Sequence, residues 1–260
     1  MIIKSTKQLE QYKKAADIST KILKELRMSI KVGLTSLELD HLADQLCSKY
    51  QVAPNFKGQG NPGNVYQHAT CISVNDTVLH GVPNNRPFKK YDVVKVDFGI
   101  EYQGLNTDHC FTVSVAGVTP QDKQLIEFSR KTIIRALSQA IAGNRTGSIG
   151  QVLESATHKS KYTVIKQFCG HGIGLTLHDK PQIPSYGNTN TGETLLEGQV
   201  LCIEAQYVTG SDKLYVGDDQ WSVSTVDGGK SAMFEYMVVV GKKKPLVLTP
   251  TMDWPIVTSG

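Results

Sequence analysis

The stretch of sequence that decides the fold is YDVVKVDFGIEYQGLNTDHCFTVSV, residues 91–115. Residues 91–100 and 105–115 have the apolar, β-branched composition of strands, and the few residues between them suit a turn. Four apolar side chains between residues 93 and 98 indicate that the first strand is buried. The stretch therefore predicts a β-hairpin that belongs to the core.

Each strand of this hairpin carries an aspartate, Asp97 in the first and Asp108 in the second. A turn centred on Tyr102 and Gln103 would place the two aspartates directly opposite each other, with Cβ atoms about 4.5–5.5 Å apart. Two carboxylates at that distance repel by roughly 3 kcal/mol at an effective dielectric constant of about 20. We therefore expect a positive group between them.

Two glutamates and two histidines extend this set. Glu204 and Glu235 both interrupt apolar strands, where a carboxylate is costly unless it is paired or bound to a metal. His171 lies between two glycines, and His178 follows in the same glycine-rich stretch. Glycines in a strand let the backbone or a ligand approach closely, so this stretch predicts a ligand site better than a plain core strand.

The candidate ligands are rich in oxygen. Four carboxylates and one imidazole suit Mn, Fe(II) or Co better than structural zinc, which prefers thiolates and imidazoles. Four negative charges balance two divalent cations, and two such ions can share one water and lower its pKa towards about 7. The set predicts a two-metal site that hydrolyses a polar bond.

The remaining pattern predicts an α+β chain. Helices are expected over residues 5–31, from Thr35, over 119–142 and over 148–159, and a second hairpin over 69–81 with its turn at Asn75–Asp76. A helix, a glycine stop and a shorter helix occur twice and each time lead into strands. We therefore expect two halves, residues 1–118 and 119–245, around one shared sheet, with the site where they meet.

Composition narrows the class of protein. The 260 residues carry a net charge of +4, with basic residues scattered along the chain, which does not favour nucleic-acid binding. The five cysteines are widely spaced and form no Cys-x-x-Cys pair, so neither a disulfide framework nor a zinc knuckle is indicated. A polar N-terminus and the lack of an apolar run of about 18 residues predict a cytoplasmic protein without a membrane span.

Taken together, these residues resemble the type I methionine aminopeptidases, which have the pita-bread α+β fold. The resemblance covers nearly the whole chain and rests on the order and spacing of its matching segments: Cys71-Ile72-Ser73-Val74-Asn75, Leu79-His80-Gly81-Val82-Pro83, residues 171–178, Trp221 and the strand of Glu235. It implies a curved, mostly antiparallel sheet with helices on its outer face. It also implies a single catalytic domain over residues 1–260, without a separate N-terminal domain.

By this resemblance, Asp97 would chelate one divalent metal ion, His171 and Glu204 the other, and Asp108 and Glu235 would bridge both. The ions would be Co, Mn or Fe(II), and the hydroxide between them would attack the substrate. Glu204 would also shuttle the proton.

The resemblance implies further roles around the metals. His178 would steady the oxyanion, and His80 would contact the substrate backbone or the leaving amine. Cys71, Tyr66, Leu177 and Trp221 would line the methionine pocket, because a thiol, aromatic rings and an aliphatic wall suit an unbranched thioether. The last implied site is for a monovalent cation (Na or K), held by the backbone of three residues: Asn75, Thr77 and Ser231.

The implied substrate is the N-terminal methionine of nascent chains with a small second residue, removed near the ribosome by a monomeric enzyme. Three positions depart from the usual pattern: Ala205 stands where Pro is usual, His109 where a small hydroxyl residue is, and Tyr236 where His is. No expected metal ligand is missing, so we interpret these changes as tuning of metal preference or rate.

Two other functions remain open from the sequence. An Xaa-Pro aminopeptidase or prolidase has the same fold, and the Asp97-Phe98-Gly99 segment leans towards it, but such relatives carry an extra N-terminal domain. A non-catalytic binding protein of this fold would have lost its metal ligands, whereas all five are present here. The two classes differ in whether the purified protein holds stoichiometric metal.

Overall fold

The computed structural model describes residues 1–259 and contains four α-helices in that range. Local sequence explains where they begin. Ser5 caps the first helix by accepting from the backbone N–H of Gln8, and Thr35 forms a full capping box with Glu38. The helices are α1 (Thr6–Ser29), α2 (Ser36–Tyr50), α3 (Pro120–Leu137) and α4 (Thr146–Ser155), the last followed by a 3₁₀ turn at Ala156–Lys159.

The centre of the molecule is a nine-stranded sheet whose strand pairs are antiparallel. Its main path runs β12-β11-β13-β16-β9-β6-β4, with β10 beside β13 and β17 beside β16. The strands are β4 (Thr70–Val74), β6 (Val93–Phe98), β9 (His109–Ser114), β10 (Thr163–Val164), β11 (Cys169–Gly172), β12 (Asp179–Pro184), β13 (Val200–Val208), β16 (Ser231–Val239) and β17 (Leu246–Val247).

Three smaller sheets lie around this centre, and one of them corrects a prediction. The strand β5 does not form a hairpin with β4; it pairs with β15 instead, and Asn75 between β4 and β5 has a left-handed backbone (φ 55°). The smaller sheets are β1 (Ala53–Pro54) with β7 (Ile100–Tyr102) and β8 (Leu105–Asn106); β14 (Leu214–Val216) with β15 (Val223–Thr225) and β5 (Thr77–Leu79); and β2 (Gly60–Asn61) with β3 (Asn64–Val65).

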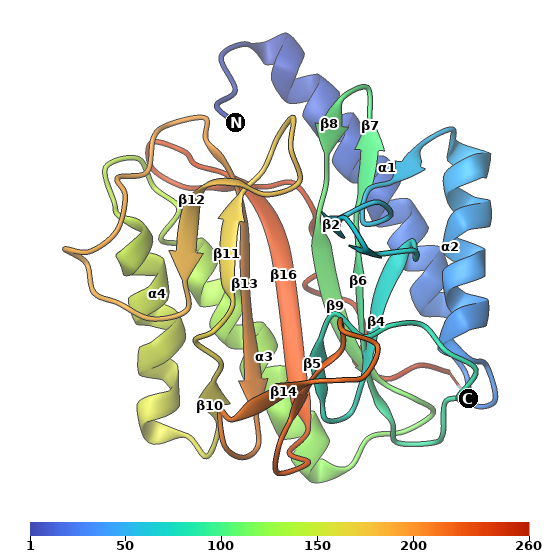
Figure 1. Ribbon diagram of the computed structural model, residues 1–260. Coiled ribbons are helices and arrows are strands. Elements are labelled where there is room, and N and C mark those ends of the chain that lie inside the picture. The colour runs from blue at the N-terminus through green and yellow to red at the C-terminus, as the bar shows by residue number, and fades with distance from the viewer. Residues whose placement is uncertain (260) are drawn as a thin grey trace.

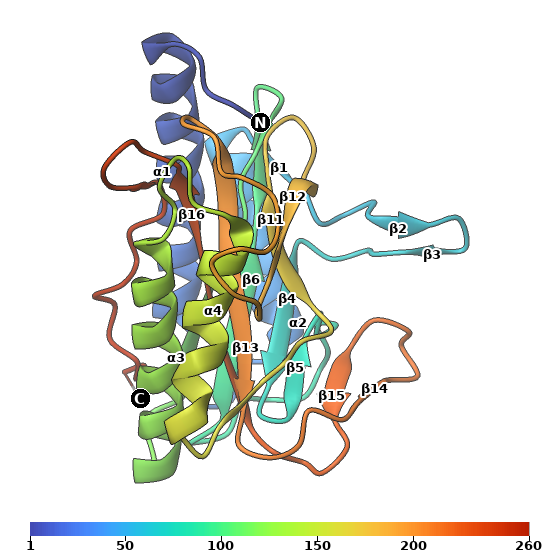
Figure 2. The same cartoon turned by 90° about the vertical axis from the view of Figure 1, so that its left-hand side faces the viewer.

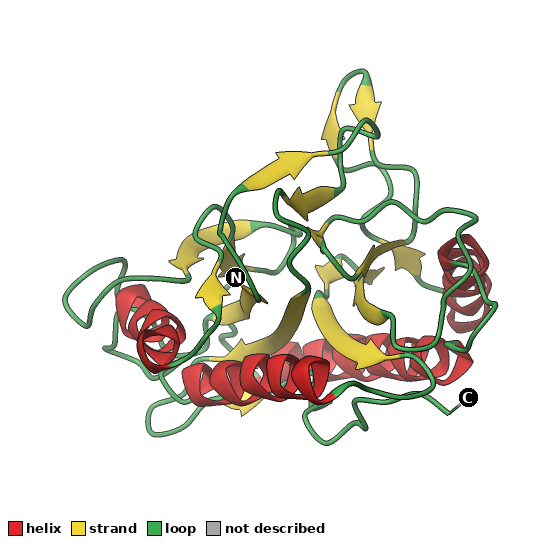
Figure 3. Ribbon diagram, turned by 90° about the horizontal axis from the view of Figure 1, so that it is seen from below, coloured by secondary structure: helices red, strands yellow, loops and turns green. Residues whose placement is uncertain are grey.

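The helices form a layer on one face of the sheet, as Figures 2 and 3 show. In Figure 1, α1 lies behind the half of the sheet that contains β6, and α3 lies behind β13 and β16, while α2 flanks β4 on the right and α4 flanks β12 on the left. The arms β2–β3 and β14–β15 project from the opposite face (Figure 2). This is the predicted arrangement, and the strands of the two halves meet where β9 pairs with β16. Within residues 1–259, no helix combines the length and apolar character needed to cross a membrane.

A buried aspartate anchors α2 to the sheet beside the open face. Asp40 is 2% exposed and accepts hydrogen bonds from the backbone N–H of Thr70 (2.9 Å) and from its hydroxyl (2.8 Å). Its other oxygen lies 2.9 Å from Nδ1 of His68. Because Thr70 begins β4 and precedes Cys71, this contact fixes the position of that strand relative to α2.

We expect Asp40→Ala to lower the free energy of unfolding by about 3 kcal/mol, because it leaves a buried backbone N–H without an acceptor. Urea unfolding followed by circular dichroism measures the loss. The matched control is Asp44→Ala, one helical turn along, which removes only an exposed salt bridge to Lys57 and should cost at most about 1 kcal/mol. Equal losses in the two variants would contradict the anchoring role.

Candidate active site

Two glutamates face each other across the central strands. Glu204 on β13 and Glu235 on β16 are direct partners in the antiparallel register. Every residue of both strands is buried, as expected for strands covered by helices on one face and by loops on the other. A carboxylate held in such a strand cannot turn to water, so its charge must be balanced locally.

The two aspartates also converge, but not by the predicted register. Asp97 on β6 is paired with Cys110, two positions beyond Asp108. The turn lies at Gln103 and Gly104, whose φ values of 53° and 78° match the left-handed residues of a type I′ hairpin turn. Asp108 therefore sits in the irregular segment between β8 and β9. Oxygens of the two aspartates and of Glu235 still lie within 4.8 Å of one another.

His171 completes this cluster from β11. Its Nε2 lies 3.7 Å from Oδ2 of Asp108 and 3.8 Å from Oε1 of Glu235. Its Nδ1 is 3.0 Å from the carbonyl of Gly172, and because a carbonyl only accepts, Nδ1 carries the hydrogen. Burial lowers the pKa of His171 to about 4, so the ring is neutral. The lone pair of Nε2 thus points at carboxylate oxygens, an arrangement that a cation between them would stabilise.

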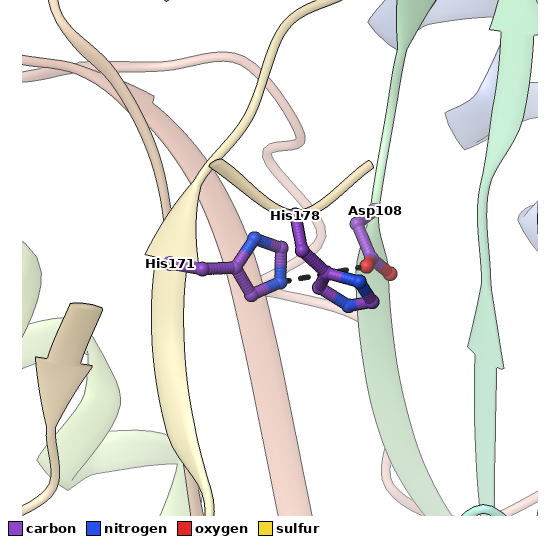
Figure 4. Close-up of side chains that lie close together, drawn as sticks. All are labelled: Asp108, His171 and His178. Carbon is purple, nitrogen blue, oxygen red and sulfur yellow. Dashed lines mark ion pairs between the residues drawn. The ribbon is translucent and has the colours of Figure 1, made fainter. Parts of the chain in front are cut away.

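His178 lies beside His171 on the loop that leads into β12. Their ring centroids are 4.5 Å apart, and the rings meet edge to face. Figure 4 shows both imidazoles and Asp108 turned towards one another across the space between β11 and the β8–β9 segment. One nitrogen or oxygen from each of the three lies within 4.8 Å of the others. The structure therefore brings both histidines together beside Asp108.

The electrostatics of the four carboxyl groups show the cost of this arrangement. Burial raises the pKa of Asp97 to about 7 and, together with the charge of Asp97, that of Glu204 to about 8. Burial and neighbouring carboxylates raise the pKa of Asp108 and of Glu235 well above the usual range. Without a cation, these groups hold protons that they would lose in water.

The donor set fits divalent metal ions. Within residues 1–259, Oδ1 of Asp97, Oδ1 of Asp108 and Oε1 of Glu235 are buried without a hydrogen-bond partner. Such oxygens beside a neutral imidazole are the ligands that Mn, Fe(II) or Co prefer. Glu204 stands slightly apart, because its Oε2 accepts a hydrogen bond from Nε2 of Gln206 and it joins none of the three-ligand groups that the structure forms.

The cluster forms the floor of a cavity of about 370 Å³ on the open face. The residues predicted for catalysis, metal binding and the methionine pocket all line it. They are Tyr66, Cys71, His80, Asp97, Asp108, His171, Leu177, His178, Glu204, Trp221 and Glu235.

Aromatic rings form one wall of this cavity. Tyr66 is 3% exposed and its ring meets that of Trp221 edge to face, with centroids 5.0 Å apart. The hydroxyl of Tyr66 donates to the carbonyl of Thr70 at 2.8 Å, which fixes the ring against the sheet. A Cβ on Gly60 would lie 2.9 Å from the Trp221 ring, so the β2–β3 arm needs glycine there to lie against the wall.

Several cavity residues were not predicted. Phe168 meets the ring of His80 edge to face at 5.6 Å, and burial lowers the pKa of His80 to about 4. Phe168 precedes the His171 strand and has no neighbouring pattern that distinguishes it from a core residue. The other unpredicted lining residues are Phe56, Gln59, Gly60, Leu79, Gln167, Cys169 and Met233.

The three departures from the usual pattern point away from the cavity. Ala205 and Tyr236 follow Glu204 and Glu235, and because side chains alternate along a strand, both pack in the core under the helices. His109 is fully buried, and its Nε2 lies 2.9 Å from the hydroxyl of Ser19 on α1. These residues support the ligand strands from behind and do not touch the cavity.

The oxygens expected to hold a monovalent cation face a lysine instead. Nζ of Lys95 lies 2.9 Å from the carbonyl of Asn75 and 2.7 Å from the hydroxyl of Ser231, which itself lies 3.1 Å from the carbonyl of Thr77. Burial lowers the pKa of Lys95 to about 7. The structure therefore corrects that expectation: an amine of the chain stands where a sodium or potassium ion was predicted.

The chain is similar to known metallopeptidases. Residues 10–242 match Metallopeptidase family M24. The chain is 33% identical to methionine aminopeptidase 1 of Bacillus subtilis over 240 residues, which cover 92% of this chain and 95% of that one. It is 35% identical to the methionine aminopeptidase of Mycoplasma capricolum over 252 residues, 96% of this chain and 98% of the other.

Solved structures give the same result for the fold. The crystal structure of methionine aminopeptidase from Thermotoga maritima superposes with a TM-score of 0.90 at 35% identity, covering 96% of this chain and 99% of that one. The prolidase of Pyrococcus horikoshii superposes with a TM-score of 0.73 at 22% identity, covering 95% of this chain and 63% of that one. The first match confirms the predicted α+β pita-bread fold, and the second shows only that the fold is shared.

The carboxyl pKa values predict how the metal-free protein responds to pH. Since they are raised in the folded state, their contribution to stability is fully present below about pH 4 and is lost as the pH rises through about 7 to 8. The lowered pKa of Lys95 has the opposite effect, since it makes stability fall as the pH is lowered, but Lys95 is one group and the carboxyl groups are four. Below about pH 6.5, histidines gain protons in the unfolded chain but stay neutral where they are buried, so they oppose a further gain in stability.

We therefore expect the Tm of chelator-treated protein to rise when the pH is lowered from about 8 to about 6.5. Added Mn²⁺ should raise the Tm most at the higher pH, because the metal displaces protons from its ligands. Differential scanning fluorimetry at both pH values, with and without metal, measures the two effects. A Tm that does not change when Mn²⁺ is added would argue against a metal centre at these carboxylates.

Proposed function

Metallopeptidase family M24 is the family to which this chain belongs, and we propose that it removes the N-terminal methionine from peptides and nascent proteins whose second residue is small. The chain is a metal-dependent aminopeptidase, a hydrolase, by its likeness to methionine aminopeptidases over nearly its whole length. One observation carries the proposal: the buried carboxylates and His171 form the floor of the same cavity whose wall suits a methionine side chain.

We propose that the five ligands hold two divalent ions. Asp97 would chelate one ion, His171 and Glu204 the other, and Asp108 and Glu235 would serve both. The unpaired carboxylate oxygens and the lone pair of His171 support this assignment. Two divalent ions, when bound, would polarise the peptide carbonyl and lower the pKa of a shared water towards about 7. Mn, Fe(II) and Co all suit these ligands.

The wall of the cavity would receive the methionine side chain. Tyr66 and Trp221 present ring edges and faces, Cys71 is a small buried thiol, and Leu177 is a buried aliphatic group. Aromatic rings favour contact with a thioether sulfur, and an unbranched side chain fits between the rings without a branch at Cβ. The pocket thus favours methionine over β-branched residues.

Three residues of the chain would handle the peptide and its protons. His178 is positioned beside the metal ligands to donate a hydrogen bond to the scissile carbonyl oxygen as negative charge develops there. His80, which is neutral, would contact the peptide backbone or the leaving amine. Glu204 would take a proton from water and pass it to the leaving amine, because a carboxylate within reach of both groups can act as a general base and then as an acid.

The same proposal covers the setting of the enzyme. Residues 1–260 would act as one catalytic domain of two halves, although Gly260 lies outside the described residues. The substrate's free amino terminus would bind beside a metal, which restricts cleavage to chain ends. We propose that it acts as a monomer in the cytoplasm on deformylated chains near the ribosome.

We expect chelator-stripped protein to release free methionine from a Met-Gly-Met peptide only after Mn²⁺ or Co²⁺ is added. An Xaa-Pro peptide and a Met-Val-Met peptide serve as controls and should be cleaved far more slowly. Amino-acid analysis of the products measures each rate. Cleavage of the Xaa-Pro peptide alone would move the activity to the proline-directed relatives, and failure to cleave any peptide despite bound metal would favour a binding role.

His178→Ala should lower kcat by about 10²–10³, because the donor to the developing oxyanion is lost. Its metal content should stay unchanged, since Asp97, Asp108, His171, Glu204 and Glu235 remain. Steady-state kinetics and metal analysis of the same sample measure both properties. The control is Leu175→Ala on the same loop, an exposed side chain (74%) that should leave both properties near those of the unaltered protein. Loss of metal from His178→Ala would mean that His178 is a ligand.

A further inference from the structure

Lys95 is a buried lysine whose charge is held by neutral oxygens. It lies on β6 and is 1% exposed. Its Nζ contacts the carbonyl of Asn75 (2.9 Å), the carbonyl of Ser231 (3.3 Å) and the hydroxyl of Ser231 (2.7 Å). A lysine that is fully removed from water normally needs compensation for its desolvation. Here that compensation comes from uncharged oxygens.

The hydrogen atoms can be counted. The Ser231 hydroxyl has one hydrogen, and the carbonyls of Asn75 and Thr77, each 3.1 Å from it, can only accept. That hydrogen is used there, so the hydroxyl offers a lone pair to Lys95. The Lys95 nitrogen therefore donates to three acceptors, which uses all three hydrogens of an ammonium group. Carbonyl and hydroxyl oxygens around one positive charge are also how proteins hold a bare monovalent ion.

The position of this contact explains what it does. β9 lies between β6 and β16, and it pairs with β16 only at Cys110 and Glu235. Towards Ser231, where β16 begins, β16 has no further ladder partner in β9, and the backbone N–H of Ser231 donates instead to the carbonyl of Asn75 at 3.0 Å. Lys95 on β6 is paired with Thr112 on β9, and its side chain extends past β9 to Ser231 on β16. The hydroxyl of Thr112 also contacts β16, because it accepts from the backbone N–H of Met233 at 3.0 Å. The ammonium thus reinforces a contact between the two halves that the backbone N–H of Ser231 also makes with Asn75.

The strands that Lys95 joins carry metal ligands. Side chains two or four residues apart share one face of a strand, so Lys95 and Asp97 lie on the same face of β6, and Ser231 and Glu235 on the same face of β16. We propose that Lys95 is a positioning residue whose ammonium serves as a built-in monovalent cation, fixing the spacing of the two halves that the ligands require. The protein then needs no sodium or potassium at this point.

This inference rests on the proposed metal centre for its functional meaning, and thermal unfolding tests the clamp separately from peptide cleavage. The variants are Lys95→Ala, which empties the oxygen cage, and Lys95→Met, which fills the space without charge. Lys89→Ala removes an exposed lysine that precedes the same strand and is the control. Each protein is melted without divalent metal in potassium, sodium or tetramethylammonium chloride at equal ionic strength, and Mn²⁺ binding is then measured by calorimetry.

We expect Lys95→Ala in tetramethylammonium to melt about 4–10 °C lower than the unaltered protein, and potassium or sodium to recover much of that loss. Its Mn²⁺ affinity should fall about tenfold in tetramethylammonium and recover with the same ions. The unaltered protein, Lys89→Ala and Lys95→Met should not distinguish the three salts, and Lys95→Met should melt low in all of them.

Three results would overturn the proposal. One is a Lys95→Ala protein as stable and as tight for Mn²⁺ as the control, and another is a loss that small cations recover no better than tetramethylammonium. The third is an unaltered protein that itself depends on potassium or sodium. If Lys95→Ala folds only in potassium or sodium, the proposal holds. If Lys95→Ala folds in none of the salts, Lys95→Met decides. A Lys95→Met protein that melts as high as the control overturns the proposal, and one that melts low in every salt supports it. Loss of peptide cleavage alone would concern the proposed reaction and leave the clamp standing.

Discussion

The constraint that governs the structure is the electrostatic cost of burying four carboxyl groups close together. Asp97, Asp108, Glu204 and Glu235 come from three strands and an irregular segment and converge below one cavity, where burial raises the pKa of each. A folded chain tolerates such a cluster only if protons or cations balance it. The neutral His171, with its lone pair turned to the same point, makes cations the better fit. Bound metal would therefore stabilise the cluster as well as supply its chemistry.

The rest of the fold holds these groups against their repulsion. Glu204 and Glu235 sit in nine-residue strands that are buried throughout, with side chains of the next residues, Ala205 and Tyr236, packed under the helices. Asp40 ties the helix layer to β4. The seam between the two halves is narrow in backbone pairing, and Lys95 and Thr112 add side-chain contacts to it.

The sequence predicted the fold class, the helices and the charged and histidine residues that line the cavity, because each rests on a strong local signal. Caps such as Thr35 with Glu38 mark helices, and charged residues within apolar strands mark the site. It failed on strand pairing and register: β5 pairs with β15, a strand far along the chain, and the turn at Gln103–Gly104 shifts the hairpin register by two. The sequence could not show what the Lys95 side chain contacts, since the oxygens that accept its hydrogen bonds belong to residues 20 and 136 positions away.

The most direct test of the account is to locate the metal ions. Crystals grown with Mn²⁺ and measured at the manganese absorption edge would show each ion by its anomalous scattering. The account predicts two Mn²⁺ ions per chain, held by Asp97, Asp108, Glu204 and Glu235 with His171 on one of them. Anomalous density for a single ion that leaves Glu204 bound only to Gln206, or for none within this cluster, would contradict it.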